Sequence, residues 1–501
     1  MLDQLRAQVA AEFARTGKRR RIKLIDDTLR DGQQCLWATR MRTEQMLPVA
    51  QLIEAAGVDS IMAIALVQYD ASMLFLNQNP LERLRLLARH MPKTELRAAV
   101  RGNLMRGFFP VADDITELFV ERNFANGARR FTLFDALLNN ENLAPGINRA
   151  KALGAKTSVM LVFNDAPAYT DEIYAEKARE AVEDFGVDAI AFGDSAGVLP
   201  IDRIRTLVPA MKSAIGDREL EFTTHCMTGL GPVQYLEAAV HGVDVIYCSI
   251  DPMANGPAPA AMQDMVRDLR YLGFEVDVDI DKLDKAGDIL RAMAEQEGQP
   301  LGEPAEYDPA LFVNRYAGGA LANLRMQLQA AGIADRLPEV LDEIGRVRVE
   351  LGSPIMATPY PAIIAGQAVM NVLHGERYRV VPDEVKKYVL GYFGALPIPV
   401  DPDVADKVIG NGSQKIALTP PPMEPVVPAL RARYPYADDD ELLLRQMYGD
   451  EKFEGLGPTG TATEFSVTHP IVDLVSALGR NRSPVRASFW LGDSSVRVNG
   501  G

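Results

Sequence analysis

The stretch TEQMLPVAQLIEAAGVDSIMAI, residues Thr43–Ile64, is typical of a helix that ends at a glycine and leads into a short apolar strand. A second segment, DEIYAEKAREAVEDFG (Asp171–Gly186), also ends in glycine and precedes an apolar run. Short apolar or β-branched runs recur between such helical segments. The predicted strands are Ile22–Asp26, Ser60–Ile64, Leu96–Val100, Arg130–Leu133, Thr157–Val162, Ala189–Phe192, Glu221–Thr224 and Val245–Cys248.

Strands that alternate with helices of this length predict a parallel sheet, and eight such units predict closure into an α/β (β/α)8 TIM barrel. An open doubly wound sheet is the alternative. From about Leu311 the strand pattern stops, and segments such as LPEVLDEIGRVRVELG (Leu337–Gly352) predict a mostly helical second domain. The Pro-rich stretch Gly410–Arg433 is predicted to be extended.

Four parts of the chain are predicted. They are an N-terminal helix with a basic connector (1–20), the barrel (21–305), the helical domain (306–455), and a linker with a C-terminal helix and hairpin (456–501). In the last part, HPIVDLVSALGRN (His469–Asn481) has helical spacing, and alternating strands flank a Gly492-Asp493 turn. An exposed two-stranded hairpin is marginal alone, so we expect it to dock against a partner.

Composition narrows the class of protein. The 501 residues carry 53 basic and 68 acidic side chains, a net charge of −15, which argues against general nucleic-acid binding. No apolar run is long enough for a membrane span, and the N-terminus lacks the apolar core of a secretory signal. The three cysteines (Cys35, Cys226 and Cys248) cannot build a disulfide framework and suit a reducing compartment. We therefore expect a soluble cytoplasmic protein.

Seven motifs stand out along the chain: LRDGQQCLWATRMRTEQMLPVA (Leu29–Ala50), DASMLFLNQNPLERLR (Asp70–Arg85), AVRGN (Ala99–Asn103), LFDALLN (Leu133–Asn139), GDSAGVL (Gly193–Leu199), THCMTGL (Thr224–Leu230) and GQAVMNVLHGERY (Gly366–Tyr378). Together they resemble a known family, the carboxyltransferase domain of pyruvate carboxylase, of the oxaloacetate decarboxylase α subunit and of the transcarboxylase carboxyltransferase subunit. The resemblance runs from about Arg21 to about Gly455. It implies a TIM barrel capped by a helical domain, and transfer of a carboxyl group between carboxybiotin and a 2-oxo acid at a divalent metal.

The resemblance also implies roles for individual residues. Arg30, Gln34 and Asp135 are the predicted catalytic residues, and Arg101 with Gln34 is predicted to bind the substrate. A pocket arginine can clamp a carboxylate in a bidentate fashion whether or not a metal is present. The predicted metal ligands are Asp31 and His225, an incomplete set.

Three family positions are replaced. The carbamylated lysine of the family corresponds to Gly193, its first metal histidine to Thr223, and its proton-shuttling threonine to Pro257. Two remaining ligands fall short of the usual three of a catalytic zinc, although a cation that keeps mostly water ligands still fits. Carboxylation of pyruvate by the family's usual route is therefore not expected. We expect an acceptor other than pyruvate.

Simpler interpretations exist for single residues. Arg30 and Asp31 can form a structural ion pair, and a lone histidine such as His225 is often a satisfied core residue. Cys226 is expected to be a packing residue, since side chains alternate along a strand.

The Met-Lys-Met motif that bears biotin is absent, so we expect biotin on another chain. The expected partners are a biotin carboxyl carrier protein, a biotin carboxylase and a small carboxylic acid substrate, with a paralogous carboxyltransferase subunit as a further candidate. The resemblance to the family also implies a homo- or hetero-oligomer. Three functions stay open: a carboxyltransferase with a non-pyruvate acceptor, which we favour, a catalytically silent scaffold, and a biotin-free lyase or decarboxylase that uses Arg30, Asp31 and Asp135.

Overall fold

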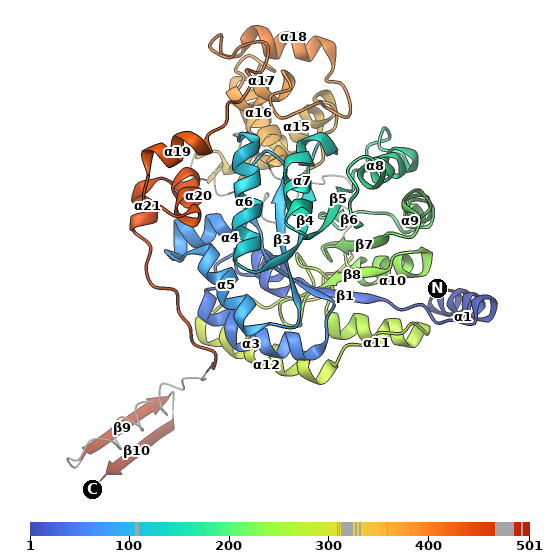
Figure 1. Cartoon of the computed structure of the whole chain (residues 1–501), viewed down its shortest axis with the longest axis vertical. Helices are drawn as coiled ribbons and strands as arrows, with labels where there is room; N and C mark the ends of the chain where they lie inside the picture. The colour runs from blue at the N-terminus through green and yellow to red at the C-terminus, as the bar shows by residue number, and fades with distance from the viewer. Residues whose placement is uncertain are drawn as a thin grey trace.

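The computed structural model describes residues 1–105, 110–307, 332–357 and 359–465, a few single positions between 309 and 329, and the backbone of two C-terminal strands. The first part is a closed barrel of eight parallel strands in the order β1 to β8 (Figure 1). The strands are β1 Lys23–Asp26, β2 Ser60–Ile64, β3 Glu95–Arg101, β4 Ala128–Phe134, β5 Lys156–Val162, β6 Ala189–Asp194, β7 Glu219–Thr224 and β8 Val245–Cys248. The predicted barrel is confirmed, and the open sheet is excluded.

Helices follow the strands and cover the outside of the barrel, as Figure 1 shows. Their apolar faces and the strands share one hydrophobic core. The helices of this part are α1 Leu2–Thr16, α2 Gln33–Leu36, α3 Thr43–Ala56, α4 Leu66–Ala71, α5 Pro80–His90, α6 Asp113–Ala125, α7 Ala144–Ala152, α8 Asp171–Glu183, α9 Ile201–Ile215, α10 Gly231–His241, α11 Met262–Leu272 and α12 Ile280–Glu297.

A second, helical part follows the barrel and packs on the loops at the carboxyl ends of its strands. Asn142 Nδ2, after β4, donates to Phe393 O at 2.9 Å, and Asn164 Nδ2, after β5, donates to Ser353 O at 2.7 Å. These contacts fix the helical part beside the barrel mouth. Its helices are α15 Leu337–Glu350, α16 Tyr360–His374, α17 Asp383–Val389, α18 Pro402–Asn411, α19 Val427–Arg433, α20 Asp439–Tyr448 and α21 Asp450–Glu454.

The prediction of an extended Gly410–Arg433 is wrong at both ends, because Gly410 belongs to the end of α18 and Val427–Arg433 forms α19. A proline in the first turn of this helix fits because that position needs no backbone N–H bond. The predicted hairpin is confirmed: β9 Val485–Leu491 pairs antiparallel with β10 Ser494–Gly500. The predicted helix at His469–Asn481 lies outside the described residues.

Inside the barrel, a buried ion pair crosses from β3 to β7. Arg97 donates to both carboxylate oxygens of Glu221, at 2.8 and 2.9 Å. Its Nε donates to Ser60 Oγ at 2.8 Å, and Tyr247 also donates to Glu221. The barrel interior is thus filled and hydrogen-bonded at this level, as in the packed core of a TIM barrel. Among the described helices, none is long and apolar enough to cross a bilayer.

Candidate active site at the barrel mouth

Two loops at the carboxyl ends of the strands bring the predicted charged residues together. The π-helical turn Thr28–Gly32 follows β1 and carries Arg30 and Asp31. His225 comes directly after the last residue of β7. Because all eight strands run parallel, their carboxyl ends open on one face, where barrel enzymes place their active sites.

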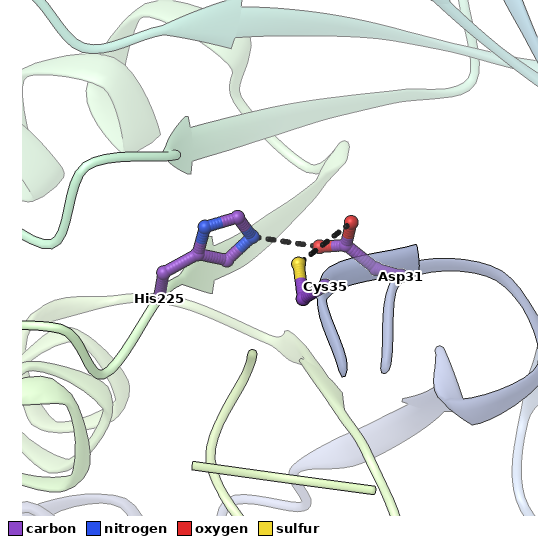
Figure 2. A group of neighbouring side chains, drawn as sticks. All are labelled: Asp31, Cys35 and His225. Atoms are coloured by element: carbon purple, nitrogen blue, oxygen red, sulfur yellow. Dashed lines mark hydrogen bonds and ion pairs between the residues drawn. The ribbon is translucent and has the colours of Figure 1, made fainter. Parts of the chain in front are cut away.

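Asp31 and His225 are in direct contact. His225 Nε2 lies 2.7 Å from Asp31 Oδ2. The other oxygen, Oδ1, accepts hydrogen bonds from Arg30 Nη1 at 2.9 Å and from Cys35 Sγ at 3.8 Å. Figure 2 shows the imidazole and the thiol directed at the same carboxylate from different segments. Both oxygens of the buried Asp31 are therefore engaged by side chains.

Asp27 fixes the orientation of Arg30. Arg30 Nε and Nη2 donate to the two oxygens of Asp27 at 3.0 and 2.9 Å, while Nη1 is left for Asp31. The backbone N–H of Asp31 also donates to Asp27 Oδ1, at 3.2 Å. A single guanidinium therefore pairs with two buried carboxylates, and bidentate pairing makes its position well defined.

The electrostatics of this cluster favour a charged Asp31 beside a charged imidazole. Burial would raise the pKa of Asp31, but Arg30 and His225 outweigh burial and hold that pKa well below its ordinary value. Burial would lower the pKa of His225, but the Asp31 carboxylate outweighs burial and raises it. The contact is therefore an ion pair as well as a hydrogen bond.

Asp31, Cys35 and His225 form the one group of possible metal ligands found within the described ranges. Their oxygen, sulfur and nitrogen donor atoms all lie within 4.8 Å of one another. Three protein ligands and one open position are usual for a catalytic zinc. The residues present therefore fit a divalent cation, with a thiol donor that was not predicted from the sequence.

The replaced family positions offer little to a metal. Gly193 on β6 pairs in register with Thr223 on β7. A Cβ atom on Gly193 would lie 3.4 Å from Met160 Sδ and 3.4 Å from Thr223 Cγ2. A thioether and a methyl group thus border the position expected for a lysine. Pro257, half-buried in the loop after β8, brings no hydroxyl group.

Arg101 is the last residue of β3 and is not joined to Asp31 by any contact between described residues. Its Nε donates to Leu104 O at 2.8 Å. Burial lowers the pKa of Arg101, while nearby Asp70 and Tyr360 act in the opposite direction. Its surroundings include α16, which begins at Tyr360, so Arg101 lies where the barrel meets the helical part.

Asp135 and Gln34 complete the predicted set. Asp135 follows β4, and its Oδ1 and Oδ2 accept hydrogen bonds from Leu137 N at 3.1 Å and from Asn142 Nδ2 at 2.7 Å. Burial raises the pKa of Asp135 to about 6. Gln34 lies in α2, and its Oε1 is buried with no hydrogen-bond partner among the described residues. Cys226, expected to be a packing residue, is 2% exposed in the hydrophobic core.

Sequence reasoning missed Cys35, although a signal was present. Cys35 follows Asp31 by one helical turn, and side chains at that spacing share a helix face. The Arg-Asp pair drew attention to Asp31 itself rather than to the residue one turn later.

Comparisons with known proteins agree with this geometry. A family model described as "Conserved carboxylase domain" matches residues 313–455. A pyruvate carboxylase subunit of Methanocaldococcus jannaschii is 34% identical over 433 residues, covering 85% of this chain and 76% of the relative. The methylmalonyl-CoA carboxyltransferase 5S subunit of Propionibacterium freudenreichii is 32% identical over 410 residues, covering 82% and 80%. The 2-oxoglutarate carboxylase large subunit of Hydrogenobacter thermophilus is 32% identical over 404 residues, covering 80% and 62%.

Among solved structures, the carboxyl transferase domain of Rhizobium etli pyruvate carboxylase with pyruvate superposes with a TM-score of 0.79 at 21% identity, covering 99% of this chain and 86% of that one. The fold is therefore that of a carboxyltransferase domain. The chain belongs to the carboxyltransferase family of the biotin-dependent carboxylases, so the resemblance found in the sequence is confirmed. The family's enzymes use biotin on a carrier domain, and the relatives above are subunits of multi-subunit enzymes.

Proposed function

We propose that this chain transfers the carboxyl group of carboxybiotin, held on a separate carrier chain, to a small carboxylic acid other than pyruvate. The observation that carries the proposal is the contact of Arg30, Asp31 and His225 at the barrel mouth. These residues come from two distant segments and form a buried charged cluster at the face where barrel enzymes act. A scaffold alone has no need to maintain such a cluster.

Arg101 supports a carboxylate-bearing acceptor. Its Nε is used in the hydrogen bond to Leu104, and we assign its two terminal nitrogens to the acceptor's carboxylate. A guanidinium binds a carboxylate through two parallel hydrogen bonds, which fixes orientation as well as position. Gln34 Oε1, buried without a partner among the described residues, offers a hydrogen-bond acceptor to a donor group of the same substrate.

The replaced positions support an acceptor other than pyruvate. Gly193 and Thr223 remove two family ligands, and Pro257 removes the family's proton-shuttling hydroxyl. The names of the relatives already include pyruvate and 2-oxoglutarate carboxylases, so one scaffold serves acceptors of different size.

The chain's own residues would bind, orient and exchange protons. When bound, carboxybiotin supplies the carboxyl group, and a divalent cation offsets negative charge on the acceptor. Arg30 holds Asp31 in place, and Asp31 orients His225 Nε2. Asp135, with a pKa of about 6, can take up or release a proton near neutral pH, as a general acid or base requires.

The test uses the native complex purified with its biotinylated carrier and biotin carboxylase chains. After loading with labelled bicarbonate and ATP, the complex is offered pyruvate, 2-oxoglutarate and other small acids, and label in an acid-stable product is measured. We expect transfer to an acid other than pyruvate. Equal or better transfer to pyruvate would contradict the acceptor assignment.

The scaffold and lyase interpretations give different outcomes in the same experiment. A scaffold would copurify with a second carboxyltransferase, and Asp31→Asn in this chain would leave label transfer unchanged. A lyase would consume its substrate without any biotinylated chain. Either outcome would replace the proposed function.

A further inference from the structure

Cys35 lies beside the two side chains that family ancestry implies as metal ligands. Its Sγ is 3.8 Å from Asp31 Oδ1, and His225 Nε2 is 2.7 Å from Asp31 Oδ2. Donor atoms around a tetrahedral zinc, with bonds of about 2.0–2.3 Å, stand about 3.3–3.7 Å apart. A small widening of the Asp31–His225 contact would therefore make room for a cation between the three donors.

The first turn of the chain after β1 holds Cys35 in this place. Trp37 Nε1 donates to Pro300 O at 3.0 Å, and the buried Gln33 Oε1 accepts from Met41 N at 3.3 Å. At Gly32, a Cβ atom would lie 2.6 Å from Met253 O, so only glycine lets the turn approach this neighbour. The segment that carries Asp31 and Cys35 is thus anchored on both sides, which keeps the two donors at a fixed separation.

We propose that Cys35 is a metal ligand that, with Asp31 and His225, completes a three-donor site selective for a borderline or soft divalent cation such as Zn²⁺ over Mg²⁺ or Mn²⁺. The proposal deepens the proposed function, since it concerns the same site. Carboxylate, imidazole and thiolate together favour zinc, while magnesium prefers oxygen ligands alone. On binding, the Cys35 thiol and the charged His225 imidazole each give up a proton to solvent, and bonds form from the metal to the Cys35 sulfur and to the freed His225 Nε2.

This site explains how the family chemistry survives the replaced positions. Gly193 and Thr223 provide neither lysine nor imidazole, and Met160 borders the former lysine position. The thiolate of Cys35 supplies the third donor. It comes from the segment after β1, whereas the replaced lysine position, Gly193, lies on β6. Ligand number is thereby restored to that of a catalytic zinc, with one position open for substrate.

The test measures metal binding in the full chain, without acceptor or carrier. The purified chain is stripped with a chelator and titrated with Co²⁺, and the near-ultraviolet sulfur-to-cobalt charge-transfer band is recorded. We expect the band in the wild type and not in Cys35→Ser. Cys226→Ser, which changes another buried cysteine, is expected to keep the band, and circular dichroism checks that each variant is folded.

Zinc binding gives a second readout. Elemental analysis after dialysis is expected to find about one zinc per wild-type chain, and Cys35→Ser should weaken zinc binding at least about 100-fold, beyond the loss typical of an outer-shell partner. An unchanged zinc affinity in a folded Cys35→Ser, or a Co²⁺ complex without the band, would overturn the proposal. Neither readout involves carboxyl transfer, so failure here is distinct from failure of the proposed function.

Discussion

Two buried charge clusters occupy different levels of the same barrel, and they differ in how completely the polar atoms around them are paired. In the interior, Arg97 and Glu221 are only 2% and 1% exposed, and Ser60 and Tyr247 satisfy their remaining hydrogen-bonding groups. This arrangement leaves nothing for a ligand to bind. A buried, fully bonded pair of this kind specifies structure.

At the mouth, Asp31 is also paired, yet unpaired atoms lie around it. Gln34 Oε1 and Ser249 Oγ are buried without hydrogen-bond partners among the described residues. Ser249 Oγ is close to the turn, 3.0 Å from a Cβ placed on Gly32. Because unsatisfied buried groups cost stability, a ligand that bonded to these two atoms would offset that cost. The interior pair is thus closed to a ligand, while the mouth keeps polar atoms that a ligand can use.

The largest expected effect is a loss of stability when the interior Arg97–Glu221 ion pair is broken. Glu221→Gln leaves Arg97 as an unpaired buried charge and should lower the free energy of unfolding by about 3–5 kcal/mol. Glu219→Gln, on the same strand but paired with Lys23 at the surface, should cost less than about 1 kcal/mol. Urea unfolding of both variants measures the difference, and equal losses would contradict the assignment of the interior pair to stability.

Asp135 is a buried carboxyl without a guanidinium partner among the described residues, so its charge should destabilise the folded chain, whereas the charge of Glu221 stabilises it. Because the pKa of Asp135 rises from 3.8 to about 6 on folding, the folded chain binds more protons between these values, and stability falls as pH rises through this window. The shift corresponds to roughly 3 kcal/mol. Asp135→Asn does not titrate, so the Tm of the wild type minus that of the variant should decrease from about pH 4 to about pH 7.

The control for this prediction is Ser158→Ala, which changes another buried polar side chain but no titratable group. The difference between its Tm and that of the wild type should stay constant across the same pH range. A wild-type minus Asp135→Asn difference that grows with pH would show that Asp135 is held charged in the folded chain.

The next largest effect is expected on substrate binding, when Arg101, the proposed carboxylate clamp, is replaced. Arg101→Ala removes a charged hydrogen-bond pair to the acceptor, which corresponds to about 1.5–3 kcal/mol, or a KM raised about 10- to 150-fold. Arg101→Lys should recover only part of this, since lysine cannot bind in a bidentate fashion. The exposed Arg129→Ala, at the other end of the barrel, should leave KM unchanged. An unchanged KM in Arg101→Ala would place the acceptor's carboxylate elsewhere.

The smallest effect compares two buried serines. Ser249→Ala removes an unpaired hydroxyl at the mouth and should be neutral or stabilise the chain by up to about 1 kcal/mol. Ser158→Ala removes a hydroxyl that donates to Thr132 Oγ1 at 3.1 Å inside the barrel, and should destabilise it by about 1 kcal/mol. Chemical denaturation would measure both, and a larger loss for Ser249→Ala would mean that its hydroxyl is bonded.

The fold was predictable because each strand is a local apolar run, and β2 begins and ends where the sequence places it. Strand β4 starts at Ala128, two residues before the predicted start at Arg130, because Ala128 pairs in register with Leu96 of β3, and the charged, exposed Arg129 that follows it does not resemble a strand in sequence. Pairing between distant segments decides such boundaries.

The candidate site was predictable only in part, for a similar reason. Arg30 and Asp31 are adjacent in the sequence, but the contact of Asp31 with His225 depends on the barrel closing between β1 and β8. Cys35 becomes a candidate metal ligand only because that contact places His225 beside Asp31. The roles of Gln34, Arg101 and Asp135 stay predictions, which the variants above test.

The surroundings of Gly193 bear on how this lineage can evolve. A lysine placed there by a single substitution would meet no obstacle at its first side-chain atom, since a Cβ would stand at ordinary contact distance, 3.4 Å, from both Met160 Sδ and Thr223 Cγ2. The lysine alone would still face Thr223, its partner in register on β7, at a position that the resemblance to the family assigns to a histidine. Recovery of both former ligands therefore needs a second substitution, at Thr223, and a descendant of this chain would have to acquire the two changes together.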